Sequence, residues 1–318
     1  MKLFYAAVII SWLLITLSAA GFAQGAVSVQ EGEIRLSVVN KKGESVTVMR
    51  GQDLKLLLNG QEQEITSLRQ QSDQPIALAV LIDTSNSQKP FINGVKEAAW
   101  RFIDDVIRPS VDTAAIVTIN TRPELKLNLT SDKARLKEAI QSLTIASRDS
   151  RGGRPQSEAG GTAIYDAVAV TSDKLLARTP ANVRRMIVAF SDGTDTSSQI
   201  KYTDAIRVAC LSKVAVFFML TRPPAQYSNG PGTAGKGEDR IMAPLAEATG
   251  GKSIAAETHS GLDAAFDLVK RYLKSSLVLR FNDIPGKGQE PLTVNIEIKS
   301  PELSKQKPEL LYPKTYFR

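Results

Sequence analysis

Long apolar runs and amphipathic segments alternate through the middle of this chain. The runs at residues 76–82, 113–119, 185–190 and 214–220 are rich in valine, isoleucine, leucine and phenylalanine. Continuous runs of this kind predict strands that are buried on both faces of a parallel sheet. Apolar residues at helical spacing occupy residues 91–106, 163–176, 202–213, 241–249 and 262–274. Strands that alternate with helices predict an α/β domain with a doubly wound, mostly parallel sheet.

The two flanks of this region have a different pattern, with short strands and turn signals. Before it, segments 53–58 and 65–68 flank Asn59-Gly60, which is a strong hairpin signal. After it, segments 277–281 and 292–298 alternate like half-exposed strands, with Pro285-Gly286 as the turn between them. Neither flank is long enough to be stable alone. We therefore expect residues 24–72 and 276–318 to pair into one small β-rich domain, into which an α/β domain of residues 73–275 is inserted.

The first residues have the pattern of an export signal. Met1-Lys2 precedes an apolar run that extends to Ala20, and the small residues Gly21 and Ala23 follow the run. This order predicts a secretory signal peptide of residues 1–23, cleaved after Ala23. The run is also long enough to span a bilayer, so a retained anchor is the alternative. Either outcome predicts an exported protein that is periplasmic, secreted or at the cell surface.

The composition does not indicate a function, but it excludes an internal disulfide and argues against a nucleic-acid partner. Of the 318 residues, 42% are hydrophobic and 23% charged, as in ordinary folded proteins. The single cysteine, Cys210, cannot form an internal disulfide, so the core and any bound metal must hold the exported domain. The 40 basic and 33 acidic residues are dispersed, and aromatic residues make up only 6%, so a nucleic-acid partner is not indicated.

The first candidate ligand residues follow directly after the apolar run of residues 76–82. Asp83, Ser85 and Ser87 alternate along the chain, so one extended turn can direct three oxygen atoms to one point. Thr162 follows two glycines and precedes a predicted helix, and Asp192 follows the third apolar run. Ligands of α/β folds bind at the carboxyl ends of the strands. Oxygen ligands with few charges favour a hard cation that keeps some of its waters.

Asp-x-Ser-x-Ser, then Thr, then Asp resembles the metal-ion-dependent adhesion site (MIDAS) of the von Willebrand factor A (VWA) domain family. The order of elements from about residue 27 to the end also resembles a group of exported bacterial proteins with a VWA-related domain. Asn86 stands where a glycine is common, Gln88 where a methionine is common, and the tail lacks the glycine expected before Tyr316. None of these departures removes a metal ligand. The ordinary alternative is that Asp83 and Asp192 cap the helices that follow them.

The resemblance implies a Rossmann-like fold and a role for each matching residue. Ser85, Ser87 and Thr162 would bind the metal directly, and Asp83 and Asp192 would hold it through waters or by direct contact. Mg²⁺ fits such a site best, with Mn²⁺ or Ca²⁺ as alternatives. Asp195 could line the same rim, but we expect it to order the turn.

The function expected from these residues is an exported, metal-dependent protein-binding or adhesion module. An Asp or Glu side chain of a protein partner would fill the open position of the metal. The alternative is a structural or assembly scaffold in which the metal mainly ties three loops together. An enzyme would need a general base that the sequence does not show.

Three catalytic motifs fit only in part. Residues 246–253 match the relaxed P-loop pattern, but a predicted helix precedes them and a strand follows, which is the reverse of a P-loop. The glycines of residues 230–235 have Rossmann spacing but lie in a long loop with a proline. His259 is the only histidine, so a histidine zinc site or a Ser-His-Asp triad would have no second histidine to help. We therefore expect no nucleotide ligand.

Overall fold

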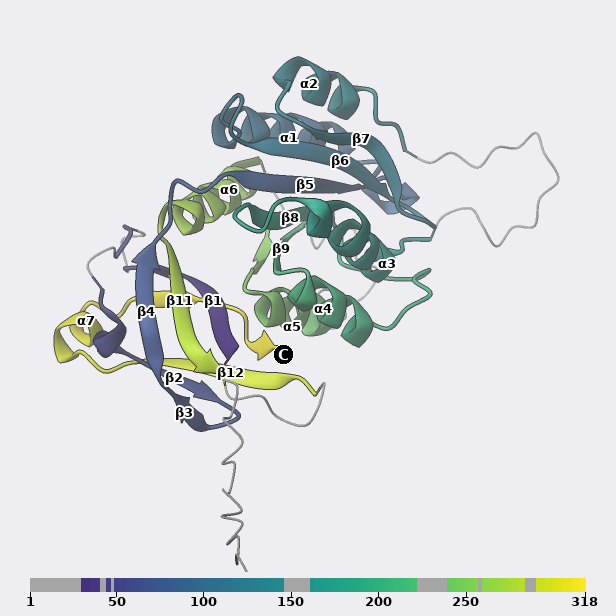
Figure 1. The fold of residues 1–318 in the computed structure, drawn as a ribbon. Helices are drawn as coiled ribbons and strands as arrows, with labels where there is room; N and C mark the ends of the chain where they lie inside the picture. Colours follow the sequence, from purple (N-terminus) through teal and green to yellow (C-terminus); the bar gives the residue numbers. More distant parts are fainter. Residues whose placement is uncertain are drawn as a thin grey trace, which may run out of the picture.

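A six-stranded sheet forms the centre of the computed structural model (Figure 1). The structure describes residues 30–40, 44–46, 49–145, 161–221, 239–256, 259–283 and 290–318. The strand order is β10-β9-β8-β5-β6-β7. The strands are β5 (Ile76–Asp83), β6 (Thr113–Ile119), β7 (Glu124–Thr130), β8 (Arg184–Ser191), β9 (Val214–Leu220) and β10 (Ser253–Ala255). Only the edge strand β7 pairs antiparallel, so the predicted α/β fold with a mostly parallel sheet is confirmed.

Helices cover both faces of this sheet, because the strands are apolar on both sides. All eight residues of β5 are buried. Leu78, Val80 and Ile82 belong to one core cluster, which also contains residues of α1 (Ile92–Val106), α2 (Lys133–Gln141) and α6 (His259–Lys274). Ala77, Ala79 and Leu81 belong to the other, with residues of α3 (Ile164–Val170), α4 (Tyr202–Leu211) and α5 (Asp239–Thr249). The alternation of β5 thus supplies two separate cores. Helix α3 continues as a π-helical turn (Thr171–Leu175) and a 3₁₀ turn (Leu176–Arg178).

The flanks form two four-stranded antiparallel sheets. One has the order β13-β1-β11-β4, and the other has the order β14-β12-β2-β3. Their elements are β1 (Gln30–Val39), β2 (Leu54–Leu58), β3 (Gln61–Gln63), β4 (Ile65–Gln70), β11 (Ser276–Asp283), β12 (Leu292–Ile298), α7 (Pro301–Lys305), β13 (Glu309–Leu311) and β14 (Thr315–Tyr316). The sheets share one core, in which Leu36 and Leu279 of the first join Leu56 and Val294 of the second. Each sheet joins a strand from before the α/β region to one from after it.

The hairpin expected between segments 53–58 and 65–68 is wrong in its second strand. Asn59-Gly60 does form a tight turn, and both residues have positive φ, but it joins β2 to the short β3. The next strand, β4, pairs with β11 in the other sheet. Strands β11 and β12 belong to different sheets, and the turn expected at Pro285-Gly286 lies outside the described residues. Each of these strands gains more by pairing with a strand of the opposite flank, because that pairing lets its apolar face reach the shared core.

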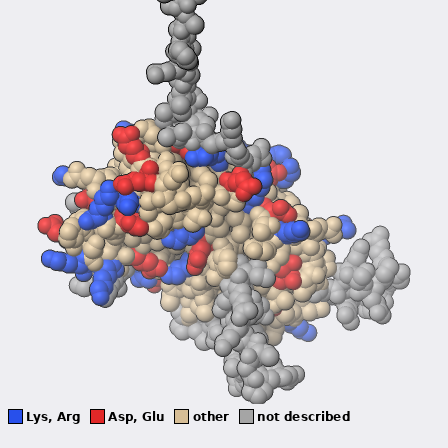
Figure 2. Space-filling model, turned by 90° about the horizontal axis from the view of Figure 1, so that it is seen from below, with Lys and Arg blue, Asp and Glu red and all other residues tan. Residues whose placement is uncertain are grey.

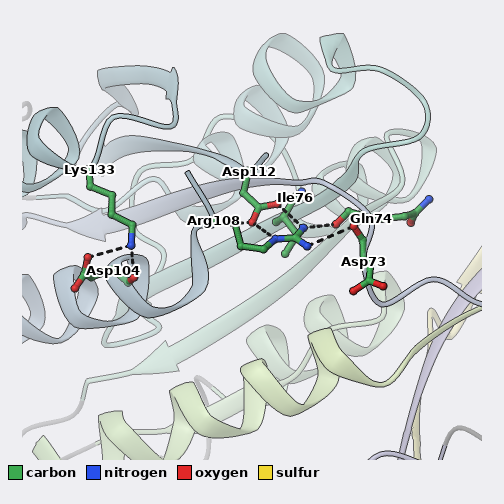
Figure 3. Close-up of polar contacts among 7 residues, drawn as sticks. All are labelled: Asp73, Gln74, Ile76, Asp104, Arg108, Asp112 and Lys133. Carbon is green, nitrogen blue, oxygen red and sulfur yellow. Dashed lines mark hydrogen bonds and ion pairs between the residues drawn. The ribbon is translucent and has the colours of Figure 1, made fainter. Parts of the chain in front are cut away.

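An ion pair between the partly exposed Arg108 and the buried Asp112 fastens the linker before β5 to the α/β region (Figure 3). The fully buried Asp112 accepts hydrogen bonds from Arg108 Nε at 2.7 Å and from Ile76 N at 2.8 Å. Arg108 Nη2 also donates to the main-chain carbonyl of Gln74 at 2.9 Å. Figure 3 shows, beside this group, the contact of Lys133 with Asp104, which joins α2 to α1. The start of β5 is therefore held by side chains as well as by sheet pairing.

Several expectations concern residues outside this description or stay untested. The signal peptide of residues 1–23 and the glycine-rich residues 230–235 lie outside the described residues. The domain limits at residues 73 and 275 stay a prediction.

Among the described residues, no helix is both long and apolar enough to cross a membrane. On the face in Figure 2, Lys and Arg side chains intermingle with Asp and Glu among the described residues.

Candidate metal centre

Hydrogen bonds join the segments that carry the predicted site residues at the carboxyl edge of the sheet. Thr84 N, after β5, donates to Ile119 O at the end of β6 at 2.8 Å. Beyond β6, Asn120 O accepts from Ala163 N at 2.8 Å. The Thr162 segment is thereby attached beside the end of β5.

The segment after β8 closes this set of contacts into a ring. Thr196 N donates to Thr162 O at 2.9 Å, and Thr162 N donates to Thr196 Oγ1 at 2.9 Å. At the end of β8, Ser191 Oγ donates to Asp83 Oδ2 at 2.7 Å. The segments that carry Asp83, Thr162 and Asp192 are thus linked in a closed circuit by the protein's own groups.

Asp83 is a buried carboxylate without a basic neighbour. Asp83 is only 1% exposed, and its Oδ1 accepts a hydrogen bond from Ser85 N at 2.8 Å. Burial raises the pKa of Asp83 to about 6; hydrogen bonds from Ser85 and Ser191 lower it, and the charge of Asp192 raises it further. Among the described residues, no Lys or Arg lies within ion-pair distance of Asp83 or Asp192. A buried carboxylate of this kind is costly unless a cation compensates it, which fits a bound metal.

Two serine hydroxyls follow Asp83 on a short 3₁₀ turn (Asn86–Gln88). Ser85 Oγ and Ser87 Oγ lie 3.0 Å apart. Ser85 is buried and makes no side-chain capping bond to the turn, whereas Ser87 is exposed. The pair therefore extends from the interior to the surface, as a site that binds a cation and an external ligand requires.

Thr162 follows a glycine that is packed closely against the segment after β8. A Cβ on Gly161 would lie 1.7 Å from Ser197 Oγ, so a side chain there would force the Ser197 side chain to move. The N–H and carbonyl of Thr162 are both engaged by the segment after β8. Its Oγ1 has no hydrogen-bond partner within the part of the chain that the structure describes. The hydroxyl of this buried residue is therefore free to act as a ligand.

The helix-capping alternative does not account for the two aspartates. Helix α1 begins at Ile92, and its capping position is Phe91 rather than Asp83. Asp192 is half-buried, and its Oδ1 accepts from Thr194 N at 3.0 Å within the turn. The next helix, α4, begins only at Tyr202. Both carboxylates shape turns at the sheet edge instead.

Asp195 has the ordering role expected for it. Its Oδ2 accepts from Ile164 N at 2.7 Å and from Ser198 Oγ at 2.6 Å, so it caps the start of α3 from a distant loop. Asp166 of α3 accepts in return from Gln199 N at 3.1 Å. The two carboxylates fix the Thr162 segment against the segment after β8.

Sequence reasoning missed Ser191 and the role of Gln88. Ser191 Oγ donates to Asp83 and accepts from Gly193 N at 3.2 Å, so one hydroxyl orients both the carboxylate and the following turn. The buried Gln88 accepts from Thr221 Oγ1 at 2.8 Å, which ties the Ser85 turn to the end of β9. In the sequence Ser191 is marked only by its place directly before Asp192; its contact with Asp83 follows from the register that pairs Ile82 with Phe190.

The donor set is rich in hydroxyl groups and poor in charge. Within the described ranges, no three residues of the His, Cys, Asp and Glu types gather closely enough to hold a metal. The candidate site instead combines the carboxylates of Asp83 and Asp192 with hydroxyl oxygens. Residues 246–253 do not form a P-loop, because α5 precedes the glycines and β10 follows them. His259 is the first residue of α6.

Comparison with known proteins gives a family match and several structures of similar fold. The von Willebrand factor type A domain family matches residues 78–194. BatB from Bacteroides thetaiotaomicron is 18% identical, with 63% of this chain and 100% of that chain covered and a TM-score of 0.45. An aerotolerance-related membrane protein from Bacteroides fragilis is 18% identical, with 62% and 98% covered and a TM-score of 0.47.

A third similar structure is proximal thread matrix protein 1 from the mussel byssus, with a zinc-occupied MIDAS motif. It is 16% identical, with 66% of this chain and 48% of that chain covered and a TM-score of 0.46. No curated protein sequence matches the chain significantly.

Proposed function

The chain contains a von Willebrand factor type A domain, and we propose that this domain is a metal-dependent protein-binding module. Ser85, Ser87 and Thr162 supply hydroxyl ligands, and Asp83 and Asp192 supply the compensating charge. A partner protein presents an Asp or Glu side chain to the remaining position. VWA domains in general mediate protein–protein interactions, and the specific ligand is the new element of this proposal.

The observation that carries the proposal is the position of Asp83. Its carboxylate is buried at the ligand-binding edge of the sheet, beside two hydroxyls 3.0 Å apart, and no basic side chain of the described residues pairs with it. A divalent cation would supply the missing positive charge. Mg²⁺ suits a set of hydroxyl and carboxylate oxygens that leaves room for water, and Mn²⁺ or Ca²⁺ are the alternatives.

Because the ligand set contains few carboxylates, a bound cation keeps a strong attraction for an external anion. Two aspartates are the only acidic residues assigned to the site, and the three remaining ligands are neutral. A carboxylate from a partner forms a short, charge-assisted contact with such a cation. Chelation of the metal should therefore abolish partner binding without unfolding the domain.

The scaffold alternative is less well supported. It requires the metal to tie the loops together, but the hydrogen bonds from Thr84 to Ile119, from Ala163 to Asn120 and from Thr196 to Thr162 already do so. An enzymatic role lacks a general base. Asp195 is committed to capping α3, and Asp83 and Asp192 are assigned to the cation. The binding role uses both Asp83 and Asp192 and leaves Asp195 as the cap of α3.

The first experiment is titration calorimetry of Mg²⁺ and Mn²⁺ into the purified chain, with Asp83→Ala/Ser85→Ala as the control. Saturable binding that the double variant loses is the expected result. The second step measures capture of a peptide library that displays Asp and Glu, against the same library with Asn and Gln, with and without chelator. Thr162→Ala should lose capture while its thermal midpoint stays nearly unchanged. Metal-independent capture, or equal capture of both libraries, would refute the proposed function.

A further inference from the structure

A cavity of about 310 Å³ lies at the opposite edge of the six-stranded sheet from the candidate metal centre. The amino ends of β8 and β9 line one side of it, and β1 and the C-terminal residues line the other. Figure 1 shows the C-terminus between the flanking sheets and α5. Ser191 lies seven positions after Arg184 in β8, which corresponds to roughly 23 Å along the strand. The cavity is therefore separate from the metal centre.

Two adjacent arginines at the start of β8 line this cavity. Arg184 Nη1 donates to the carbonyl of Leu273 at 3.2 Å, near the C-terminal end of α6. Arg185 Nη1 and Nη2 donate to the carbonyls of Ser212 and Thr179 at 2.9 and 2.7 Å. Neither guanidinium lies within ion-pair distance of a carboxylate in the described ranges. Arg185 Nε also donates to Thr179 Oγ1 at 3.0 Å, so both charges are held by neutral carbonyl and hydroxyl groups.

Arg184 keeps unused donors. Its two hydrogen bonds both come from Nη1, so Nε and Nη2 have no partner among the residues that the structure describes. Burial lowers the pKa of Arg184 to about 10, and the charge of Arg35 acts in the same direction. The guanidinium remains charged at neutral pH, but the surrounding protein does not stabilise that charge fully. Capping of α6 explains one nitrogen of this side chain and leaves the other two without a role.

The remaining charges of the cavity do not compensate these arginines. Arg35 pairs with Glu33 at 3.4 Å, and Arg318 pairs with Asp283 at 2.9 Å. The carboxylate of Glu31, which also lines the cavity, pairs with Arg280 at 3.1 Å. Lys213, exposed at the rim, adds a further positive charge with no acidic partner among the described residues. The lining therefore has an excess of positive charge where Arg184, Arg185 and Lys213 meet.

Much of the remaining lining is apolar, although Ser37, Thr249 and Thr315 also contribute to it. Val214 and Leu311 contribute aliphatic surface, and Pro313 and Phe317 lie on the C-terminal side. Concave sites at domain interfaces with apolar walls and a few charged groups are typical of small-molecule binding, and about 300 Å³ is within the usual range of volumes. A guanidinium with free Nε and Nη2 groups presents the fork that binds carboxylate or phosphate oxygens in pairs.

We propose that this cavity binds a small organic anion, with its carboxylate or phosphate group on Arg184 and its apolar part against Leu311, Pro313 and Phe317. The enclosed volume admits a small molecule and excludes a folded partner. Because the cavity lies between the α/β region and the flanking sheets, an occupant contacts both. The ligand would therefore stabilise one arrangement of the two parts.

The test uses phenyl phosphate and phenylacetate as probes, with benzyl alcohol as the neutral analogue. Each is titrated into the full chain in the presence of chelator, so that the result is independent of the metal centre. Saturable binding of at least one anion, and none of benzyl alcohol, is expected; the better anion identifies the headgroup. Arg184→Gln should weaken binding of that anion by about tenfold or more, since a hydrogen-bonded charge is lost.

Arg135→Gln, an exposed position on α2 outside the cavity, makes the same charge change and should leave affinity unchanged. If Arg184→Gln lowers the thermal midpoint, Lys213→Gln at the exposed rim provides the decisive comparison, with several-fold weaker binding expected. Absence of saturable anion binding to the native chain overturns the proposal. So does equal affinity in the cavity variant and in Arg135→Gln.

Discussion

Ser191 donates its hydroxyl hydrogen to Asp83 Oδ2 at 2.7 Å, although 108 residues separate the two in sequence. The pairing of β5 with β8 brings them together, because Ile82 lies opposite Phe190 in the parallel register. The hydroxyl holds one oxygen of the carboxylate, while Ser85 N holds the other at 2.8 Å. Asp83 is therefore fixed from two strands at once, and its orientation depends on both.

Ser191→Ala should weaken Mg²⁺ binding by roughly 10- to 100-fold, as loss of a partner that orients a metal ligand commonly does. The cost in folding free energy should be only about 1 kcal/mol, because one hydrogen bond is lost. Calorimetric titration and urea unfolding of the same preparation measure both quantities. Ser253→Ala, in β10 away from the site, is the matched control. Unchanged metal affinity in Ser191→Ala would show that the hydroxyl does not position the carboxylate.

Asp195→Ala should destabilise the domain by about 1–2 kcal/mol, because the start of α3 loses its cap. Asp195 accepts from Ile164 N at 2.7 Å, so the variant leaves that N–H and the loop of Ser198 without their partner. Urea unfolding checks the magnitude. Asp173→Ala, at an exposed position in the turn after α3, should cost much less. Equal losses in the two variants would mean that Asp195 is not a cap.

Asp112→Asn should lower the free energy of unfolding by about 3 kcal/mol, because Arg108 loses its buried partner. The loss should be near the lower limit of such effects, since the Arg108 side chain is 42% exposed. Asp104→Asn, which removes a surface pair with Lys133, should change stability by less than about 1 kcal/mol. Urea unfolding of the two variants at neutral pH makes the comparison.

The ion pair of Asp112 with Arg108 also predicts how the stability of the fold changes in acid. Burial alone would raise the pKa of Asp112, but hydrogen bonds from Arg108 and Ile76 N outweigh it and hold the pKa below its ordinary value. The unfolded chain therefore binds the proton more readily, so the contribution is present above about pH 4 and is lost as pH falls through the lowered pKa. Unfolding midpoints measured from pH 6 to pH 3 should fall less steeply in Asp112→Asn than in the native chain. Parallel slopes would contradict the assignment.

Removal of residues 276–318 should unfold the N-terminal flank while the six-stranded sheet stays folded. Strand β1 loses its partner β11, and β2 loses β12, so the shared core of the two flanking sheets disappears. Hydrogen exchange of the truncated chain should show unprotected amides in β1 and β2 and protected amides in β5 and β8. Protection that persists in β1 and β2 would show that the N-terminal flank folds alone, and would refute the predicted pairing as one domain.

The sequence by itself determined the elements of the α/β region and the candidate ligands. Residues 113–119 and 214–220 are strands with the predicted limits, because long apolar runs can be buried only inside a sheet covered on both faces. Asp83, Ser85 and Ser87 could be proposed as a candidate ligand set because their spacing lies within one turn. These features depend on local order along the chain, which the sequence displays directly.

Only the tertiary structure decided which distant segments meet. The alternation of β2 and β4 indicates that each has a buried face, but it does not indicate which strand lies beside it; β2 pairs with β12 and β4 with β11. For the same reason the sequence did not reveal Ser191 on Asp83, Asp195 at the start of α3, or Arg184 in the cavity. Such contacts arise from strand register and from the packing of the two parts of the chain, and these depend on the combined energy of all the buried contacts.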